Sequence, residues 1–181
     1  MIALVTLWMI GIHVAGNSYT AIQVLTDPWF SGFQLSSGLE DVFVKTMREH
    51  YDVLLPLSIA QLLIAGLLVV LSAVAVFAGR LSLMLALQTI GVMAALSIGS
   101  YVAEQPVREA RINAQVAENA ELMREQLGDQ DVDLYQLFWN GERLALMIKL
   151  AALVLSGVAL SRPRVRHFYA YHAAARANQE R

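Results

Sequence analysis

The side chains with the most chemical potential in this sequence are two ionisable groups inside apolar stretches. His13 lies within the stretch 2–25, and Lys149 lies within the stretch 139–160. In helical form each sits about 16 Å from one end of its stretch, at ~1.5 Å per residue, and so near the middle of a bilayer. An ionisable group at that depth costs at least about 2.5–3.5 kcal/mol on insertion scales, so we predict that both residues contact a ligand. The competing interpretation is structural: His13 donates to a backbone carbonyl of its own helix, and Lys149 packs against carbonyls or Asn17 inside a bundle.

A haem group is a weaker alternative for His13. A b-type haem in a helical bundle needs two axial ligands at matching depth on facing helices, and no second histidine lies inside an apolar stretch. Met84 or Met93 would have to supply the second ligand. The sequence has no cysteine and no glycine-rich phosphate loop. Its histidines and carboxylates are not spaced as the ligands of a metal site are. We therefore expect neither a metal nor a resident cofactor.

A further set of polar side chains lies in one half of the expected bundle. This is the half on the side of the membrane opposite to the two chain termini. The members of the set are Asn17, Gln23, Tyr51, Gln61, Asn140 and Arg143. Together they predict a polar pocket that opens at this end, with Asn17 and Gln61 as ligand-binding residues. The alternative is hydrogen bonding between helices, which contributes only about 0.6 kcal/mol on average in membranes and requires no ligand.

The composition indicates that these residues belong to a protein embedded in a lipid bilayer. Hydrophobic residues make up 57% of the 181-residue chain, charged residues make up 15%, and the mean hydropathy is +0.52. These values are far too apolar for a soluble domain of this size. We predict an all-α polytopic membrane four-helix bundle with spans at about 2–25, 53–78, 81–102 and 139–160. The first stretch lacks a positive leading segment and a cleavage site, so we interpret it as a retained span and not as a signal peptide.

Two amphipathic helices are expected between the spans, both at the end that carries the polar residues. They cover about 39–52 and 106–127, and a disordered loop is the alternative for the acidic segment 103–138. Within the third span, small residues crowd one region, namely Gly91, Ala94, Ala95, Ser97 and Gly99. Small residues let helix backbones approach closely in lipid, so we predict that the tightest helix contact lies there.

Arginines after the last span set the predicted orientation. Arg162, Arg164, Arg166 and His167 follow it directly, and basic clusters beside a span stay in the cytoplasm. Four spans then place both termini inside, with 162–181 as a basic cytoplasmic tail, although basic residues such as Lys45 and Arg124 in the outer segments weigh against this orientation. The expected location is the cytoplasmic membrane of a bacterium, and the lipid bilayer is the expected partner. A net charge of -2 and a pI near 6.1 give no reason to expect nucleic acid.

The start of the last span resembles a motif of a known family. The segment Gln136-Leu137-Phe138-Trp139-Asn140-Gly141-Glu142-Arg143 is similar to the W-x-x-W-N-x-x-R pattern that opens the last helix of anthrone-oxygenase-like membrane proteins, with glutamine in place of the first tryptophan. The segment 105–113, with its proline and Asn113, resembles the P-x-N-x-x-L-like element that follows the third span in that family, with a longer spacing here. These are small four-span proteins, many of them of unknown function.

The resemblance implies that dioxygen oxidises a polycyclic, phenol-like substrate without a bound metal or flavin. His50 or Asn140 would act as the base or orienting group, Arg143 would stabilise the oxyanion, and Trp139 would stack on the substrate ring. Arg111 and Asn113 would belong to a lid above the pocket. Interfacial anchoring is the alternative for Trp139 and Arg143. At the level of the whole protein, the alternative is a non-catalytic accessory or assembly subunit, which would act as a homo-oligomer or with other membrane subunits.

Overall fold

The structure is a computed structural model that describes residues 2–27, 37–74, 80–127, 133–165, 167 and 171. The described residues form six α-helices and no strand, which confirms the predicted all-α class. The helices are α1 (Ile2–Thr26), α2 (Ser37–Glu49), α3 (Tyr51–Val74), α4 (Arg80–Ala103), α5 (Gln105–Leu127) and α6 (Leu134–Ser161).

Four of these helices are long and apolar enough to cross a membrane. They are α1, α3, the Leu83–Ala103 part of α4, and α6. Each exceeds the roughly 20 residues that a hydrocarbon core of about 30 Å requires. Large apolar side chains such as Leu63, Val70 and Leu155 lie exposed on their outer surfaces, where lipid chains would cover them. The chain is therefore an integral membrane protein.

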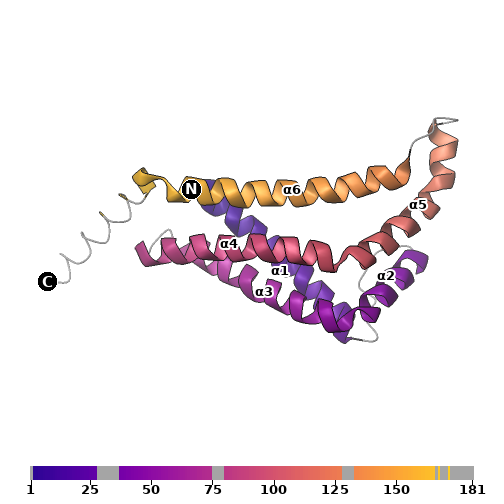
Figure 1. Ribbon diagram of the computed structural model, residues 1–181, viewed down its shortest axis with the longest axis horizontal. Coiled ribbons are helices and arrows are strands. Elements are labelled where there is room, and N and C mark those ends of the chain that lie inside the picture. Colours follow the sequence, from indigo (N-terminus) through magenta and orange to yellow (C-terminus); the bar gives the residue numbers. More distant parts are fainter. Residues whose placement is uncertain are drawn as a thin grey trace.

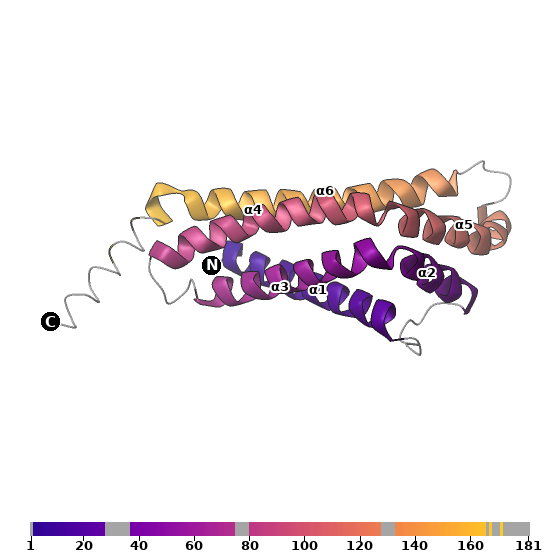
Figure 2. The same cartoon turned by 60° about the horizontal axis from the view of Figure 1, so that its bottom comes forward.

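The four spans pack as two layers, one of α1 and α3 and the other of α4 and α6 (Figure 2). The layers are joined where α3 contacts α4 and where α1 contacts α6. The start of α1 and the end of α6 lie at one end of the bundle, which we call the termini end (Figure 1). Helices α2 and α5 lie at the other end, which we call the α2/α5 end. This arrangement places α2 and α5 together at one end, as the sequence predicts.

Gly11 marks a close approach of α1 to α3. A Cβ atom at Gly11 would lie 2.6 Å from Cγ2 of Val69 and 3.1 Å from the carbonyl oxygen of Ala65. By contrast, a Cβ at Gly91 or Gly99 would meet nothing within 4 Å. The prediction that the small residues of α4 make the tightest helix contact is therefore wrong. Gly91, Ala95 and Gly99 lie on an exposed face of α4, although Ser97 of the same cluster is buried.

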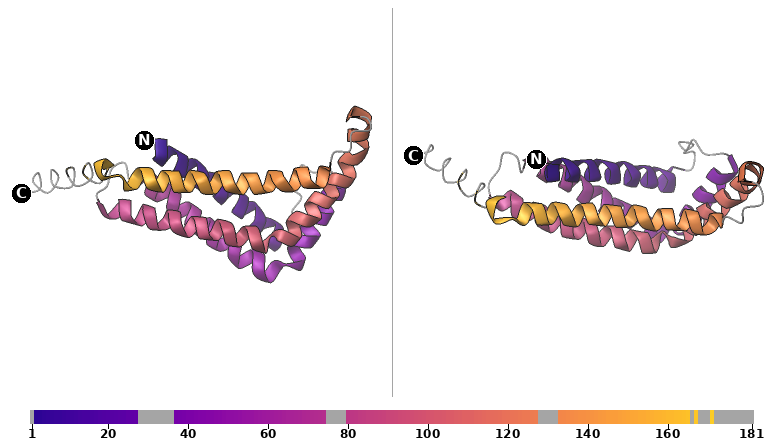
Figure 3. Two further views of the ribbon diagram at one scale, coloured as in Figure 1. Left: turned by 45° about the horizontal axis from the view of Figure 1, so that its top comes forward. Right: turned by 90° about the horizontal axis from the view of Figure 1, so that it is seen from above.

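Helices α2 and α5 are positioned by interruptions of helical structure at single residues. Helix α2 ends at Glu49 and α3 begins at Tyr51, so the chain bends at His50, before Pro56. Helix α5 follows α4 after Glu104 and leaves its line, so that it packs beside α2 (Figure 3). Arg48 of α2 donates to the carbonyl oxygens of Val24 at 3.3 Å and Asp27 at 2.9 Å, which satisfies groups at the end of α1.

Several helix ends differ from the predicted boundaries. Helix α6 begins at Leu134, earlier than the predicted 139, because the Asp133 side chain caps it by accepting from the N–H of Gln136 at 3.0 Å. The segment 105–127 is helical, in place of the disordered alternative. Residues 75–78 of the predicted second span lie outside the described residues, as does most of the predicted tail 162–181.

Candidate ligand-binding site

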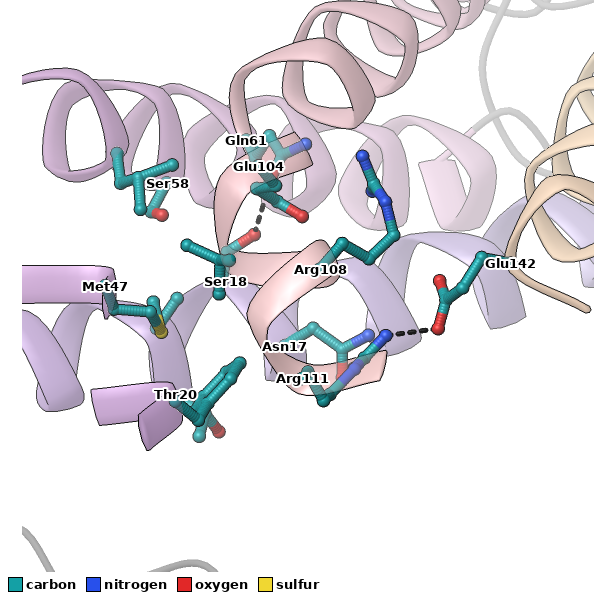
Figure 4. Close-up of a pocket in the computed structure, with 14 residues that line it drawn as sticks. Asn17, Ser18, Thr20, Met47, Ser58, Gln61, Glu104, Arg108, Arg111 and Glu142 are labelled. Carbon is teal, nitrogen blue, oxygen red and sulfur yellow. Dashed lines mark hydrogen bonds and ion pairs between the residues drawn. The ribbon is translucent and has the colours of Figure 1, made fainter. Parts of the chain in front are cut away.

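A cavity of about 480 Å³ lies inside the α2/α5 end of the bundle, a size typical of small-molecule sites (Figure 4). Helices α1, α2, α3 and α5 supply most of its wall, and α6 contributes Glu142. One group of lining residues is apolar and the other is polar or charged. The apolar residues are Ala21, Phe43, Met47, Leu54 and Val107, and the polar ones are Asn17, Ser18, Thr20, Ser58, Gln61, Glu104, Arg108, Arg111 and Glu142.

Arg108 is the most deeply buried cation of this wall, with only 6% of its surface exposed. Its guanidinium donates to the carbonyl oxygen of Tyr101, in the last turn of α4, and lies 3.8 Å from the centroid of the Tyr101 ring. The Trp139 ring is on another side of the guanidinium, at 5.9 Å. Among the described residues, Arg108 Nε is buried without a hydrogen-bond partner. A buried charge with an unused donor is costly, so this wall of the cavity is suited to an anionic or oxygen-bearing ligand.

Arg111 lies one turn further along α5 and forms an ion pair with Glu142 of α6. Both side chains are about one-third exposed, at 33% and 34%. Figure 4 shows the pair beside Asn17, which also lines the cavity and is itself exposed. The cavity therefore opens beside Asn17, where α5 is tied to α6 by this pair.

Glu104 is the second carboxylate of the cavity wall, and it lies in the turn between α4 and α5. Burial raises the pKa of the Glu104 carboxyl above its ordinary value, and the charge of Glu142 adds to this rise. The positive charges of Arg108, Lys149 and Arg111 oppose it, in that order of size. Glu104 therefore holds its proton to a higher pH than an exposed glutamate does.

The deeper wall is neutral and is fixed between helices. Ser18 of α1 donates from Oγ to Oε1 of Gln61 on α3 at 3.3 Å, and both side chains are buried. Ser58 lies one turn before Gln61 on the same face of α3 and is also buried. This part of the cavity thus carries hydroxyl and amide groups but no charge.

The structure brings three of the residues predicted from sequence to the cavity, namely Asn17, Gln61 and Arg111. His13 lies one turn from Asn17 on the exposed face of α1, with Nε2 at 3.2 Å from Asn17 Nδ2. Lys149 does not line the cavity, but it is half-buried on α6 and interacts electrostatically with Glu104. The predicted lid residue Asn113 is exposed on α5, outside the cavity wall.

The residues given catalytic roles by the family resemblance lie outside the cavity. His50 is half-buried in the turn between α2 and α3, where its Nδ1 donates to the Thr46 carbonyl oxygen at 3.0 Å. Asn140 and Arg143 are exposed on α6. The Arg143 guanidinium lies 5.6 Å from the centroid of the Trp139 ring, and the Arg108 guanidinium lies 5.9 Å from the same centroid.

Trp139 itself is half-buried and does not line the cavity. Its ring stacks on the ring of Tyr135, with centroids 6.3 Å apart and an interplanar angle of 9°. The cations that face the cavity are therefore Arg108 and Arg111.

Sequence reasoning missed Glu104, Arg108 and Glu142. A signal for the first two was present, because positions 104, 108 and 111 recur at helical spacing and so share one face of α5 and its leading turn. Glu142 directly precedes Arg143 in the family-like motif, and the helical phase of α6 turns the carboxylate toward the cavity and the arginine outward.

Within the part of the chain that the structure describes, no group of three or more histidine, cysteine or carboxylate residues could hold a metal ion. His13 lies on the exposed face of α1, Met84 is exposed on α4, and Met93 is packed in the apolar core. Comparisons of the chain with protein-family models, with curated proteins and with solved structures gave no match.

Proposed function

We propose that this membrane protein binds a hydrophobic, phenol-like small molecule in the cavity at the α2/α5 end and promotes its oxidation by dioxygen. The observation that carries the proposal is the position of Arg108 in the cavity wall, where it is the most deeply buried cation. The apolar part of the wall, with Phe43, Met47 and Leu54, suits a ring system. The bilayer around the bundle would concentrate such a ligand near the opening beside Asn17.

The charges around the cavity favour a ligand that becomes an anion. Three cations, Arg108, Arg111 and Lys149, act on this region, whereas Glu104 and Glu142 are its two carboxylates. With three cations against two carboxylates, positive charge is in excess even when both carboxylates are ionised. A phenolate or enolate would be stabilised by this excess, most directly by Arg108.

The oxidation is the chemistry that the anthrone-oxygenase-like resemblance implies. Anthrone and one O₂ give anthraquinone and one water, so atoms and electrons balance without another oxidant or reductant. Loss of a proton makes the anthrone carbon electron-rich, and the resulting anion then transfers electrons to O₂. The protein would need to supply a base, a cation beside the developing oxyanion and a pocket that excludes water.

The test is anthrone-dependent O₂ uptake by the full chain in nanodiscs, with anthraquinone formation measured in parallel. We expect the wild-type protein to exceed empty nanodiscs, and Arg108→Gln to lose about 10²–10³-fold of the rate, as loss of an oxyanion donor does elsewhere. Arg164→Gln, which removes an exposed arginine at the termini end, is the matched control.

Two results would decide against parts of this proposal. Wild-type rates equal to those of empty nanodiscs would end the oxygenase assignment. A full rate in Arg108→Gln together with a lost rate in Arg143→Gln would move the anion site to the position that the family motif implies.

The orientation is part of the same proposal. We propose that the α2/α5 end faces outward across a bacterial cytoplasmic membrane, because the arginines after α6 would stay in the cytoplasm. The chain has no cysteine, so single cysteines report position without background. A membrane-impermeant maleimide should label Lys45→Cys in intact spheroplasts and should label Arg164→Cys only after lysis. The reverse pattern would invert the topology.

A second candidate function is that of a subunit in a larger membrane complex. It is favoured by the exposed face of α4, on which Gly91, Ala95 and Gly99 recur every four residues and are not covered by any described helix. Such faces commonly contact another helix in lipid. Native mass spectrometry after mild-detergent extraction should then detect a partner or a second copy, which Gly99→Leu should release. A strictly monomeric particle would count against this function.

A further inference from the structure

Glu104 is held in place by backbone hydrogen bonds on both sides. Its N–H donates to the carbonyl oxygen of Ser100 at 2.8 Å, and its own carbonyl oxygen accepts from the N–H of Arg108 at 2.9 Å. Pro106, early in α5, has no N–H to extend the α4 hydrogen-bond ladder, so the chain turns at this point. The backbone therefore fixes the position of Glu104 in the cavity wall, one turn before Arg108 (Figure 4).

The two carboxylates of the cavity differ in their partners. Glu142 is engaged in the ion pair with Arg111. Among the described residues, no hydrogen bond or ion pair engages the side chain of Glu104. Its lone pairs are therefore available to a molecule in the cavity, whereas those of Glu142 are already used.

The charged groups that face Glu104 come from two helices. Helix α5 contributes Arg108 and Arg111, and α6 contributes Lys149 and Glu142. The cavity residues of α1, α2 and α3 are uncharged, as the serines, Asn17 and Gln61 illustrate. A carboxylate in this setting is partly desolvated but lies near cations that would stabilise any anion formed beside it.

These conditions are those of a general base. A base must reach the reacting proton, must not be committed to another partner, and works best when its pKa lies near the working pH. The raised pKa of Glu104 brings it nearer to that range than an exposed glutamate would be. His50, the base that the family resemblance implies, lies outside the cavity wall.

We propose that Glu104 accepts the acidic proton of the phenol-like ligand as it binds, and that the resulting anion is held beside Arg108. This inference rests on the proposed binding site but does not require the oxidation. The ligand O–H bond breaks, its proton forms a bond to a Glu104 carboxylate oxygen, and the electron pair stays on the ligand oxygen. No charge is gained or lost by the complex, and no oxidant is needed.

The test uses 4-nitrophenol, whose anion absorbs visible light that the neutral phenol does not. The full chain in nanodiscs is titrated below the solution pKa of the probe, with empty nanodiscs subtracted. The wild-type protein should bind the probe as its phenolate, and calorimetry in two buffers of different ionisation enthalpy should detect no net proton release. In Glu104→Gln the phenolate absorbance of the bound probe should fall by about tenfold or more.

Two companion variants keep the result interpretable. Glu109→Gln removes an exposed carboxylate from α5, close to Glu104 in sequence, and should leave the phenolate band unchanged. Glu104→Asp keeps a carboxylate and should restore part of the band, which a purely structural role for the glutamate would not produce.

The outcomes separate this inference from the proposed function. A full phenolate band in Glu104→Gln, or a wild-type protein that binds only neutral phenol, overturns the role of Glu104 while the binding site stands. A wild-type protein that binds no probe overturns both. If the protein does not oxidise anthrone but shows the expected phenolate bands, the oxygenase assignment is removed and Glu104 remains the proton acceptor.

Discussion

The termini end and the α2/α5 end of the bundle are built from different side chains. The termini end is packed with apolar residues, including Leu4, Leu7, Leu68, Leu153 and Leu160. At the α2/α5 end, a smaller apolar cluster with Val24, Met47 and Val107 surrounds a cavity that contains arginine and glutamate side chains. Close packing at one end therefore holds the spans together while the other end stays open and polar. Stability and ligand binding should separate along the bundle.

The largest expected effect lies in the packed half. Leu68 is fully buried among the spans, so Leu68→Ala should lower the free energy of unfolding by about 2–5 kcal/mol through lost contacts and a cavity. Equilibrium unfolding in mixed micelles measures it. Leu63→Ala, five residues earlier on α3 and 67% exposed, is the matched control and should change stability little. An equal loss in the free energy of unfolding at both positions would contradict the view that the packed half is the source of stability.

A smaller effect is expected from pH at Glu104. Its folded-state pKa is raised, so the folded protein binds more protons than the unfolded chain at pH values between the ordinary 4.5 and the raised value. The contribution of Glu104 to stability is therefore fully present below 4.5 and is lost as the pH rises through the raised pKa. Unfolding curves across this interval should show that loss in the wild-type protein and a flatter profile in Glu104→Gln. An unchanged profile would mean that Glu104 is not desolvated.

The smallest effect should come from the ion pair at the opening of the cavity. Arg111 and Glu142 are each about one-third exposed, so water screens their attraction. A double-mutant cycle with Arg111→Ala and Glu142→Ala should give a coupling of about 0.2–1 kcal/mol in the free energy of unfolding. A coupling of several kcal/mol would show that this half of the bundle is held by charge and would remove the contrast between the two ends.

The membrane architecture was predictable because apolar runs of span length reflect the thickness of the bilayer and need no knowledge of tertiary contacts. The placement of Asn17, Gln61 and Arg111 in one cavity also agrees with the sequence argument. The presence of Glu104 and Arg108 in one cavity wall was not predicted, because it depends on the turn at Glu104 and on the packing of α5 against α2. Likewise, the spacing of Gly91 and Gly99 indicates a face suited to close approach but not whether the partner is in the same chain.

The central claim is that Arg108 anchors an anionic ligand in the α2/α5 end. Equilibrium binding of 4-nitrophenolate to the full chain in nanodiscs, above the solution pKa of the probe, tests it without depending on proton transfer or oxidation. We expect binding by the wild-type protein and by Arg164→Gln, and a loss of affinity of about tenfold or more in Arg108→Gln, since a hydrogen bond to a charged group contributes about 1.5–3 kcal/mol. Unchanged affinity in Arg108→Gln would contradict it.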